Sequence, residues 1–186
     1  MKEISLHILD ILQNSIAANA TFVELYIEEN IKKDIFMFYV KDNGKGMDEE
    51  FLKNVTSPFT TKRKTRNVGL GIPLLKLAAE NTGGELKIES EVGKGTKTEA
   101  VFKYSSIDRQ PLGNIADTFY TVVESYLDVE FLYTHIVNDE KFVFDTREIK
   151  KILNGVSLNE PEVSSWISEY LKEGEENLEK IKHREV

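Results

Sequence analysis

The sequence predicts an α+β fold, a two-layer sandwich in which helices cover one face of a largely antiparallel sheet. Three observations support this prediction. Apolar positions recur at helical spacing near the N-terminus, β-forming segments with alternating polarity come in pairs, and a helical segment lies between the two pairs. The first 104 residues therefore read helix–strand–strand–helix–helix–strand–strand, and a small α+β domain is expected to follow them.

The first predicted helix covers residues 3–19, where one face repeats every three or four positions. The positions on that face are Ile4, Ile8, Ile11, Leu12, Ser15 and Ile16. Asp10 and Asn14 are therefore expected one turn apart on a shared face of the helix.

Two hairpins are predicted from alternating, β-rich segments. Residues 21–27 and 35–40 form the first pair around a polar break, and residues 85–90 and 96–104 form the second around the turn at 92–95. Between the hairpins, residues 48–53 predict a short helix with an acidic first turn. Residues 71–81 predict a helix that starts at a glycine-rich loop and has Pro73 in its first turn.

The domain boundaries expected from these patterns are a first domain at 1–104, a linker at 105–113 and a small acidic α+β domain at 114–186. In the last segment, Asn114 is expected to cap a helix that runs to residue 127. Residues 129–136 and 141–145 predict a hairpin, and Thr146 is expected to cap a helix that ends at residue 153. The stretch from residue 159 predicts an acidic helix whose apolar stripe is either core or a docking face for a partner.

The composition excludes several classes of protein. A hydrophobic content of 40% suits a globular chain, and no run of about 18 apolar residues predicts a membrane span. The N-terminus has no secretion leader, so a cytoplasmic location is expected. Because there are no cysteines, disulfides, thiolate metal sites and cysteine nucleophiles are excluded.

The net charge of −8 is carried by the second half of the chain. Residues 1–104 hold 15 basic and 15 acidic side chains, whereas residues 105–186 hold 9 and 17. Nucleic-acid binding relies on clustered basic side chains, so direct binding of nucleic acid is not expected.

Four short motifs are more informative together than singly: Asp10–Asn14, Asp42–Gly46, Asn67–Ile72 and Gly93–Thr96. Asp42 at a strand end can accept a hydrogen bond from the exocyclic amine of adenine, although Asp-Asn-Gly is also a common turn. Asn14 offers an oxygen to Mg²⁺ and Asp10 offers a general base, although both also suit the polar side of an ordinary helix.

A phosphate-binding role is predicted for Gly69 and Gly71, because they precede a helix N-terminus. The basic segment at 58–67 could close over a triphosphate, and its alternative is a solvated loop. The turn at Gly93–Thr96 is interpreted as mainly structural.

Together with the segment at 57–62, these motifs resemble the N, G1, F, G2 and G3 boxes of the GHKL superfamily over residues 1–104. That superfamily includes gyrase-type topoisomerases, large heat-shock chaperones, histidine kinases and MutL-type repair proteins. The resemblance implies the Bergerat ATP-binding fold with ATP and Mg²⁺ as cofactors. It implies that Asn14 binds the metal and that Asp42 binds adenine. The other implied nucleotide contacts are Gly44, Gly46, Met47, Thr61, Lys62, Gly69, Leu70, Gly71 and Thr96.

The implied ATP lid, residues 59–67, is short, as in histidine kinases and anti-sigma-factor serine kinases. Two departures matter. Asp10 stands where the ATPase and serine-kinase branches usually have Glu. The ATP domain starts at residue 1 of this sequence, so the phosphoacceptor hairpin of the usual histidine kinase is not expected. The histidines, His7, His135 and His183, stand in no acceptor motif, and His7 is interpreted as a helix surface residue.

Two functions are consistent with this pattern. The first is a standalone regulatory kinase-like protein that uses Asp10 to pass a phosphoryl group to a partner protein. The second is a slow ATPase or nucleotide-dependent switch that binds a partner without phosphotransfer. A homodimer is possible in either case.

Overall fold

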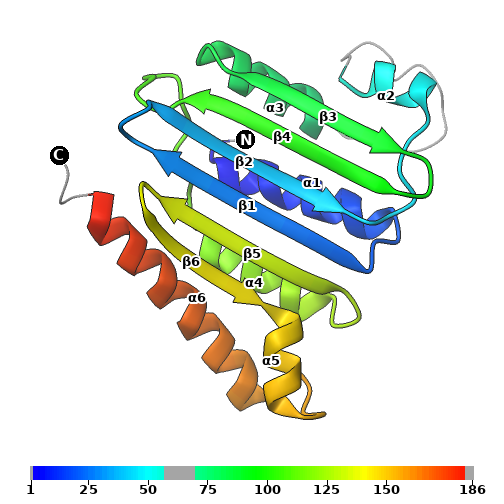
Figure 1. Ribbon diagram of the computed structural model, residues 1–186, viewed down its shortest axis with the longest axis vertical. Helices are drawn as coiled ribbons and strands as arrows, with labels where there is room; N and C mark the ends of the chain where they lie inside the picture. The colour runs from blue at the N-terminus through cyan, green and yellow to red at the C-terminus, as the bar shows by residue number, and fades with distance from the viewer. Residues whose placement is uncertain (1, 57–69, 183–186) are drawn as a thin grey trace.

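The computed structural model describes residues 2–56 and 70–182, and it contains a six-stranded sheet with helices packed on one face (Figure 1). The strand order is β3-β4-β2-β1-β5-β6. The strands are β1 (Phe22–Asn30), β2 (Ile35–Asp42), β3 (Glu85–Glu91), β4 (Gly95–Lys103), β5 (Glu130–Val137) and β6 (Glu140–Asp145). The helices are α1 (Ile4–Ala17), α2 (Glu49–Val55), α3 (Gly71–Asn81), α4 (Ile115–Ser125), α5 (Thr146–Leu153) and α6 (Pro161–Lys182).

Strand β5 pairs with β1 in parallel, and every other neighbouring pair of strands is antiparallel. The parallel register runs from Phe22 opposite Glu130 to Glu29 opposite Val137. The strands on either side of the predicted linker at residues 105–113 therefore belong to one sheet. The linker residues connect β4 to α4.

Alternation along the strands decides which face of the sheet is covered. On β1 the side chains of Val23, Leu25 and Ile27 are buried, while their neighbours are half-buried. The buried face meets α1, α3 and α4, and α6 lies along β6 (Figure 1). The result is the two-layer arrangement that the alternating pattern predicts.

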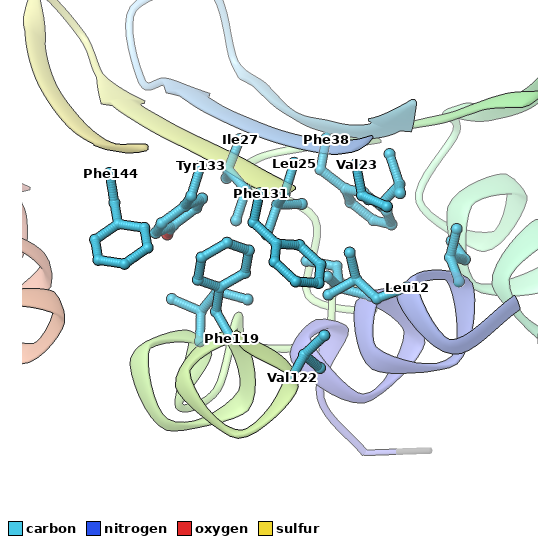
Figure 2. Close-up of a cluster of buried hydrophobic side chains, with 14 of the residues drawn as sticks. Leu12, Val23, Leu25, Ile27, Phe38, Phe119, Val122, Phe131, Tyr133 and Phe144 are labelled. Carbon is cyan, nitrogen blue, oxygen red and sulfur yellow. The ribbon is translucent and has the colours of Figure 1, made fainter. Parts of the chain in front are cut away.

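The centre of the core lies where α4 meets the C-terminal half of the sheet (Figure 2). Phe119 of α4 is fully buried, and its ring centroid lies 5.9 Å from Phe131, 4.9 Å from Tyr133 and 5.9 Å from Phe144. These rings fill the space between α4, β5 and β6, so the C-terminal segment has no separate core of its own.

Helix α1 is held at both ends by backbone contacts with distant segments. Its first amides donate to the connection after β4, Ile4 N to Pro111 O (2.9 Å) and Ser5 N to Leu112 O (2.8 Å). These bonds satisfy N–H groups that a helix cannot pair internally. At the other end, Ala18 O accepts from Lys45 N at 2.9 Å. The position of α1 relative to the sheet is therefore fixed.

Two details differ from the sequence-based expectations. His7 is 2% exposed rather than on the surface, and its Nε2 lies 3.1 Å from Gln110 Oε1. Asp145, not Thr146, caps α5 by accepting from Arg147 N at 2.9 Å. The Thr146 hydroxyl instead accepts from Phe131 N at 2.8 Å, because its side chain is buried against β5.

The acidic helix α6 supplies both core and surface. Ile167 and Leu171 are buried against the sheet and α4, which favours the core interpretation of the apolar stripe. Trp166 and Tyr170 stack with ring centroids 5.1 Å apart and stay 48% and 38% exposed. The stripe is therefore core along one edge and open along the other.

Candidate functional site

Asp42 is the last residue of β2, and the residue is only 8% exposed. Its Oδ2 accepts from the hydroxyl of Ser15 at 2.7 Å, and its Oδ1 accepts from Gly44 N at 2.9 Å. Each carboxylate oxygen can accept a second hydrogen bond. The structure therefore holds a buried carboxylate in a fixed orientation with accepting capacity left over for another donor.

The loop after Asp42 is pressed against the end of α1 and the turn before β4. A Cβ at Gly44 would lie 2.8 Å from Ala18 O, which is too close for any side chain. Gly46 has φ +66° and lies against the carbonyl of Glu91. Since a side chain is strained in that backbone conformation and would also clash, glycine is required at position 46.

Thr96 and Met47 are joined through Ser90. Thr96 lies opposite Asp42 in the pairing of β2 with β4. Its hydroxyl is 2.8 Å from Ser90 Oγ, and the same Oγ accepts from Met47 N at 2.8 Å. The β3–β4 hairpin thus holds the loop that carries Gly44 and Gly46 beside Asp42.

Asp10 and Asn14 lie one turn apart on α1, as their spacing predicts. Asn14 Nδ2 is 3.5 Å from Asp10 Oδ2, a distance at the long limit of a hydrogen bond. The Asp10 carboxylate lies directly against the α-carbon of Gly71, the first residue of α3, so that a Cβ there would overlap it. Leu70, which precedes Gly71, is 61% exposed.

The structure therefore places α1, the end of β2, the start of β4 and the N-terminus of α3 around one region. A family model described as histidine kinase-, DNA gyrase B- and HSP90-like ATPase matches residues 2–106, which is more than half of the chain. The chain belongs to this ATPase family.

Curated relatives of this chain include bacterial sensor proteins and kinases. A putative sensor protein of Shewanella frigidimarina (strain NCIMB 400) is 32% identical over 105 residues, which cover 54% of this chain and 16% of the relative. Sporulation kinase C of Bacillus subtilis (strain 168) is 43% identical over 67 residues, which cover 36% of this chain and 15% of the relative. The chain spans about a sixth of the length of these two proteins.

A solved structure described as the N-terminal domain of a DNA repair protein shares the fold. The two superpose with a TM-score of 0.52 at 14% sequence identity, covering 77% of this chain and 52% of that chain. The chain has the two-layer Bergerat fold, here with a mixed six-stranded sheet.

Membership in the ATPase family implies ATP binding, and the residues present fit an adenine nucleotide. A buried carboxylate that receives only neutral donors from the described residues keeps lone pairs for the exocyclic amine of adenine. The absence of a side chain at Gly44 lets the loop pack against Ala18, which keeps its backbone beside the Asp42 carboxylate. At the start of α3, Gly71 and Ile72 supply backbone amides of the kind that can bind phosphate at a helix N-terminus.

Most of the residues predicted from the motifs come together. These are Asp10, Asn14, Asp42, Gly44, Gly46, Met47, Gly71 and Thr96. Thr61, Lys62 and Gly69 lie outside the described residues. Two further residues of this region, Ser15 and Ser90, were not predicted from the motifs. For Ser15 a signal existed, because it is a polar residue within the apolar repeat of α1.

A separate cavity of about 460 Å³ lies away from this site, between the β4–α4 connection and α6. Its wall includes Glu29, Arg109, Glu175 and Lys182, and none of the residues predicted to bind nucleotide lines it.

Over residues 2–56 and 70–182, no helix has the length and apolar character needed to cross a bilayer.

Proposed function

We propose that this ATPase-family protein binds Mg-ATP and passes the γ-phosphoryl group to a side chain on a separate protein, as a regulatory kinase-like factor. The observation that carries the proposal is the buried Asp42 carboxylate. Ser15 and Gly44 fix its orientation, and it lies beside the helix that presents Asp10 and Asn14. The similarity to bacterial sensor proteins and kinases supports a role in signalling.

Asn14 is the proposed Mg²⁺ ligand. Its amide nitrogen is directed toward Asp10, while Oδ1 has no hydrogen-bond partner among the described residues. Mg²⁺ prefers oxygen ligands and shares its coordination with nucleotide phosphates. The side chain is exposed, so the metal would reach it without rearrangement of the core.

Asp10 is the proposed general base. Its carboxylate is half-buried, one turn from Asn14 and at the N-terminus of α3. It would accept the proton of an acceptor hydroxyl as that oxygen attacks the γ-phosphorus. Asp is one methylene shorter than the usual Glu. The close approach of α3 at Gly71 places the start of that helix directly against the Asp10 carboxylate.

The same contact supports a second candidate function, an ATP-dependent switch. Because Asp10 touches Gly71, a phosphate at the N-terminus of α3 would meet the Asp10 carboxylate and displace one helix relative to the other. In that case ATP would change a protein-binding surface without phosphotransfer.

The test follows γ-labelled Mg-ATP with the purified protein and measures bound nucleotide, released phosphate and label on candidate proteins. Asp42→Asn and Asn14→Ala are expected to weaken nucleotide binding roughly 10–100-fold, the range for losing a hydrogen bond to a charged group or a metal ligand. Asp10→Asn is expected to abolish turnover while leaving binding within about threefold of the unmodified protein.

The matched controls are Asp139→Asn in the β5–β6 turn and Gln13→Ala, next to Asn14 on α1, both at exposed positions. Neither should change binding or turnover. Turnover that survives Asp10→Asn would remove Asp10 from the base role, whereas tight nucleotide binding with no label on any candidate protein would favour the switch. Absence of nucleotide binding by the unmodified protein would contradict both functions.

A further inference from the structure

His135 of β5 is buried between two carboxylates that come from different elements. Its Nε2 lies 3.1 Å from Glu29 Oε1 on β1, and its Nδ1 lies 2.9 Å from Glu175 Oε2 on α6. The side chain of His135 is 1% exposed and that of Glu29 is 3% exposed. The imidazole therefore connects the last turns of α6 to two strands of the sheet, far from the nucleotide residues.

Hydrogen-bond chemistry decides which protonation state this geometry requires. A neutral imidazole has one N–H donor and one bare nitrogen, whereas an ionised carboxylate only accepts. Both contacts can be hydrogen bonds between ionised partners only when His135 is an imidazolium that donates from both nitrogens. Removal of its proton leaves a nitrogen lone pair facing a carboxylate oxygen in a buried place.

We propose that His135 is a protonation-controlled clasp that fastens the C-terminal half of α6 to the sheet. While His135 is doubly protonated it holds Glu29 and Glu175 together. When it loses a proton, one contact becomes repulsive and Glu175 is released with its part of α6.

The charges around His135 agree with a cationic imidazole. The network holds the buried carboxylate of Glu29 and the half-buried carboxylate of Glu175. Among the described residues, Lys182 supplies an ammonium to Glu29, its Nζ donating to Oε1 at 2.6 Å. An imidazolium supplies the second positive charge. The other titratable groups that face this network are Tyr133, Glu179, Tyr104 and Arg109. The Tyr133 hydroxyl donates to Glu175 Oε1 at 2.6 Å, which orients that carboxylate toward His135.

The pKa directions give the pH window of the clasp. Burial alone would lower the pKa of His135, but the hydrogen bonds that the imidazolium donates to Glu175 and Glu29, together with their charges, outweigh burial and raise that pKa above 6.5. Its contribution to stability is therefore complete below pH 6.5 and is lost as the pH rises through the raised value. Burial opposes ionisation of Glu29, but His135 and Lys182 lower its pKa below 4.5. The contribution of ionised Glu29 to stability is therefore lost as the pH falls through this lowered pKa.

The clasp also forms part of the wall of the 460 Å³ cavity, because Glu29, Glu175 and Lys182 line it. Release of Glu175 would open this wall on the α6 side. The device therefore couples pH to the accessibility of a cavity that lies beside the connection capping α1.

The experiment measures amide hydrogen exchange of the whole protein from pH 5 to 9, corrected for the intrinsic dependence of exchange on pH. As the pH rises, protection at residues 175–182 is expected to fall. The total fall should be about tenfold for each unit by which the pKa of His135 in the folded state exceeds its pKa in the unfolded state. Protection of α4 should stay constant. In Glu175→Gln the pH dependence should disappear, and in the exposed control Glu173→Gln it should remain.

A second measurement keeps the proposal testable if the Glu175 variant folds poorly. Nitrogen chemical shifts of the histidine side chains, assigned by replacing the other two histidines in turn, should show His135 doubly protonated at pH 6.5. A neutral single tautomer at that pH with α6 fully protected would overturn the proposal. Equal pH dependence in Glu175→Gln and the unmodified protein would overturn it too.

Discussion

Ser15 supplies one of the two hydrogen bonds that orient the Asp42 carboxylate. In Ser15→Ala the buried Oδ2 loses its hydroxyl donor, and Asp42 is free to turn away from its position at the end of β2. A lost hydrogen bond to a charged group costs about 1.5–3 kcal/mol. We expect ADP to bind roughly tenfold or more weakly, as measured by titration calorimetry. Ser125→Ala on the exposed side of α4 is the control, and equal affinities in both variants would contradict this role for Ser15.

A comparison of substitutions at Gly46 and Gly93 distinguishes the effect of backbone strain from that of steric overlap. Both have positive φ, +66° and +78°, but a Cβ on Gly46 would meet the Glu91 carbonyl, while a Cβ on Gly93 would have nothing within 4 Å. Gly93→Ala should therefore lower the free energy of unfolding only by the cost of a left-handed residue, about 1–2 kcal/mol. Gly46→Ala should lower it by more, because its Cβ would overlap backbone atoms. Urea unfolding measures both variants, and equal losses would show that the overlap relaxes.

Single residues of the site were predictable where backbone chemistry restricts the choice of residue. Asp42 and the glycines after it form a recognisable motif, because a tight turn beside a carboxylate limits the sequence. Ser90 gave no such signal. Its hydroxyl matters only because the hairpin register brings it to Thr96, and that register is set by pairing across the turn.

At the scale of elements, periodicity and capping residues predicted the three hairpins β1–β2, β3–β4 and β5–β6 and the six helices of the described residues, but they did not predict the pairing of β5 with β1. Alternation records which face of a strand is buried and not which strand lies beside it. The parallel register joins residues about a hundred positions apart, from Phe22 opposite Glu130 onward, so no local turn marks it. The linker composition therefore suggested two domains where the structure has one sheet.

Phe119 tests how α4 is attached to that sheet. Its ring is fully buried among Phe131, Tyr133 and Phe144, which lie on β5 and β6. Phe119→Ala would leave a cavity between α4 and the sheet, and such substitutions cost about 3–5 kcal/mol. We expect a matching fall in the free energy of unfolding. Phe51→Ala on α2, where the ring is 43% exposed, should change it by less than about 0.5 kcal/mol. Similar losses in both variants would contradict the packing described for α4.

For the whole molecule, the shared sheet predicts that both halves unfold as one unit. Trp166 is the single tryptophan and lies on α6, so its fluorescence reports the C-terminal half, whereas circular dichroism reports the whole chain. The two urea transitions should coincide. Mg-ADP at 100 times its dissociation constant should stabilise both by about 2.7 kcal/mol, because a ligand that binds the folded state stabilises everything that unfolds with it. If Mg-ADP shifts the urea midpoint measured by circular dichroism but not the midpoint measured by Trp166 fluorescence, the two halves unfold independently despite their common sheet.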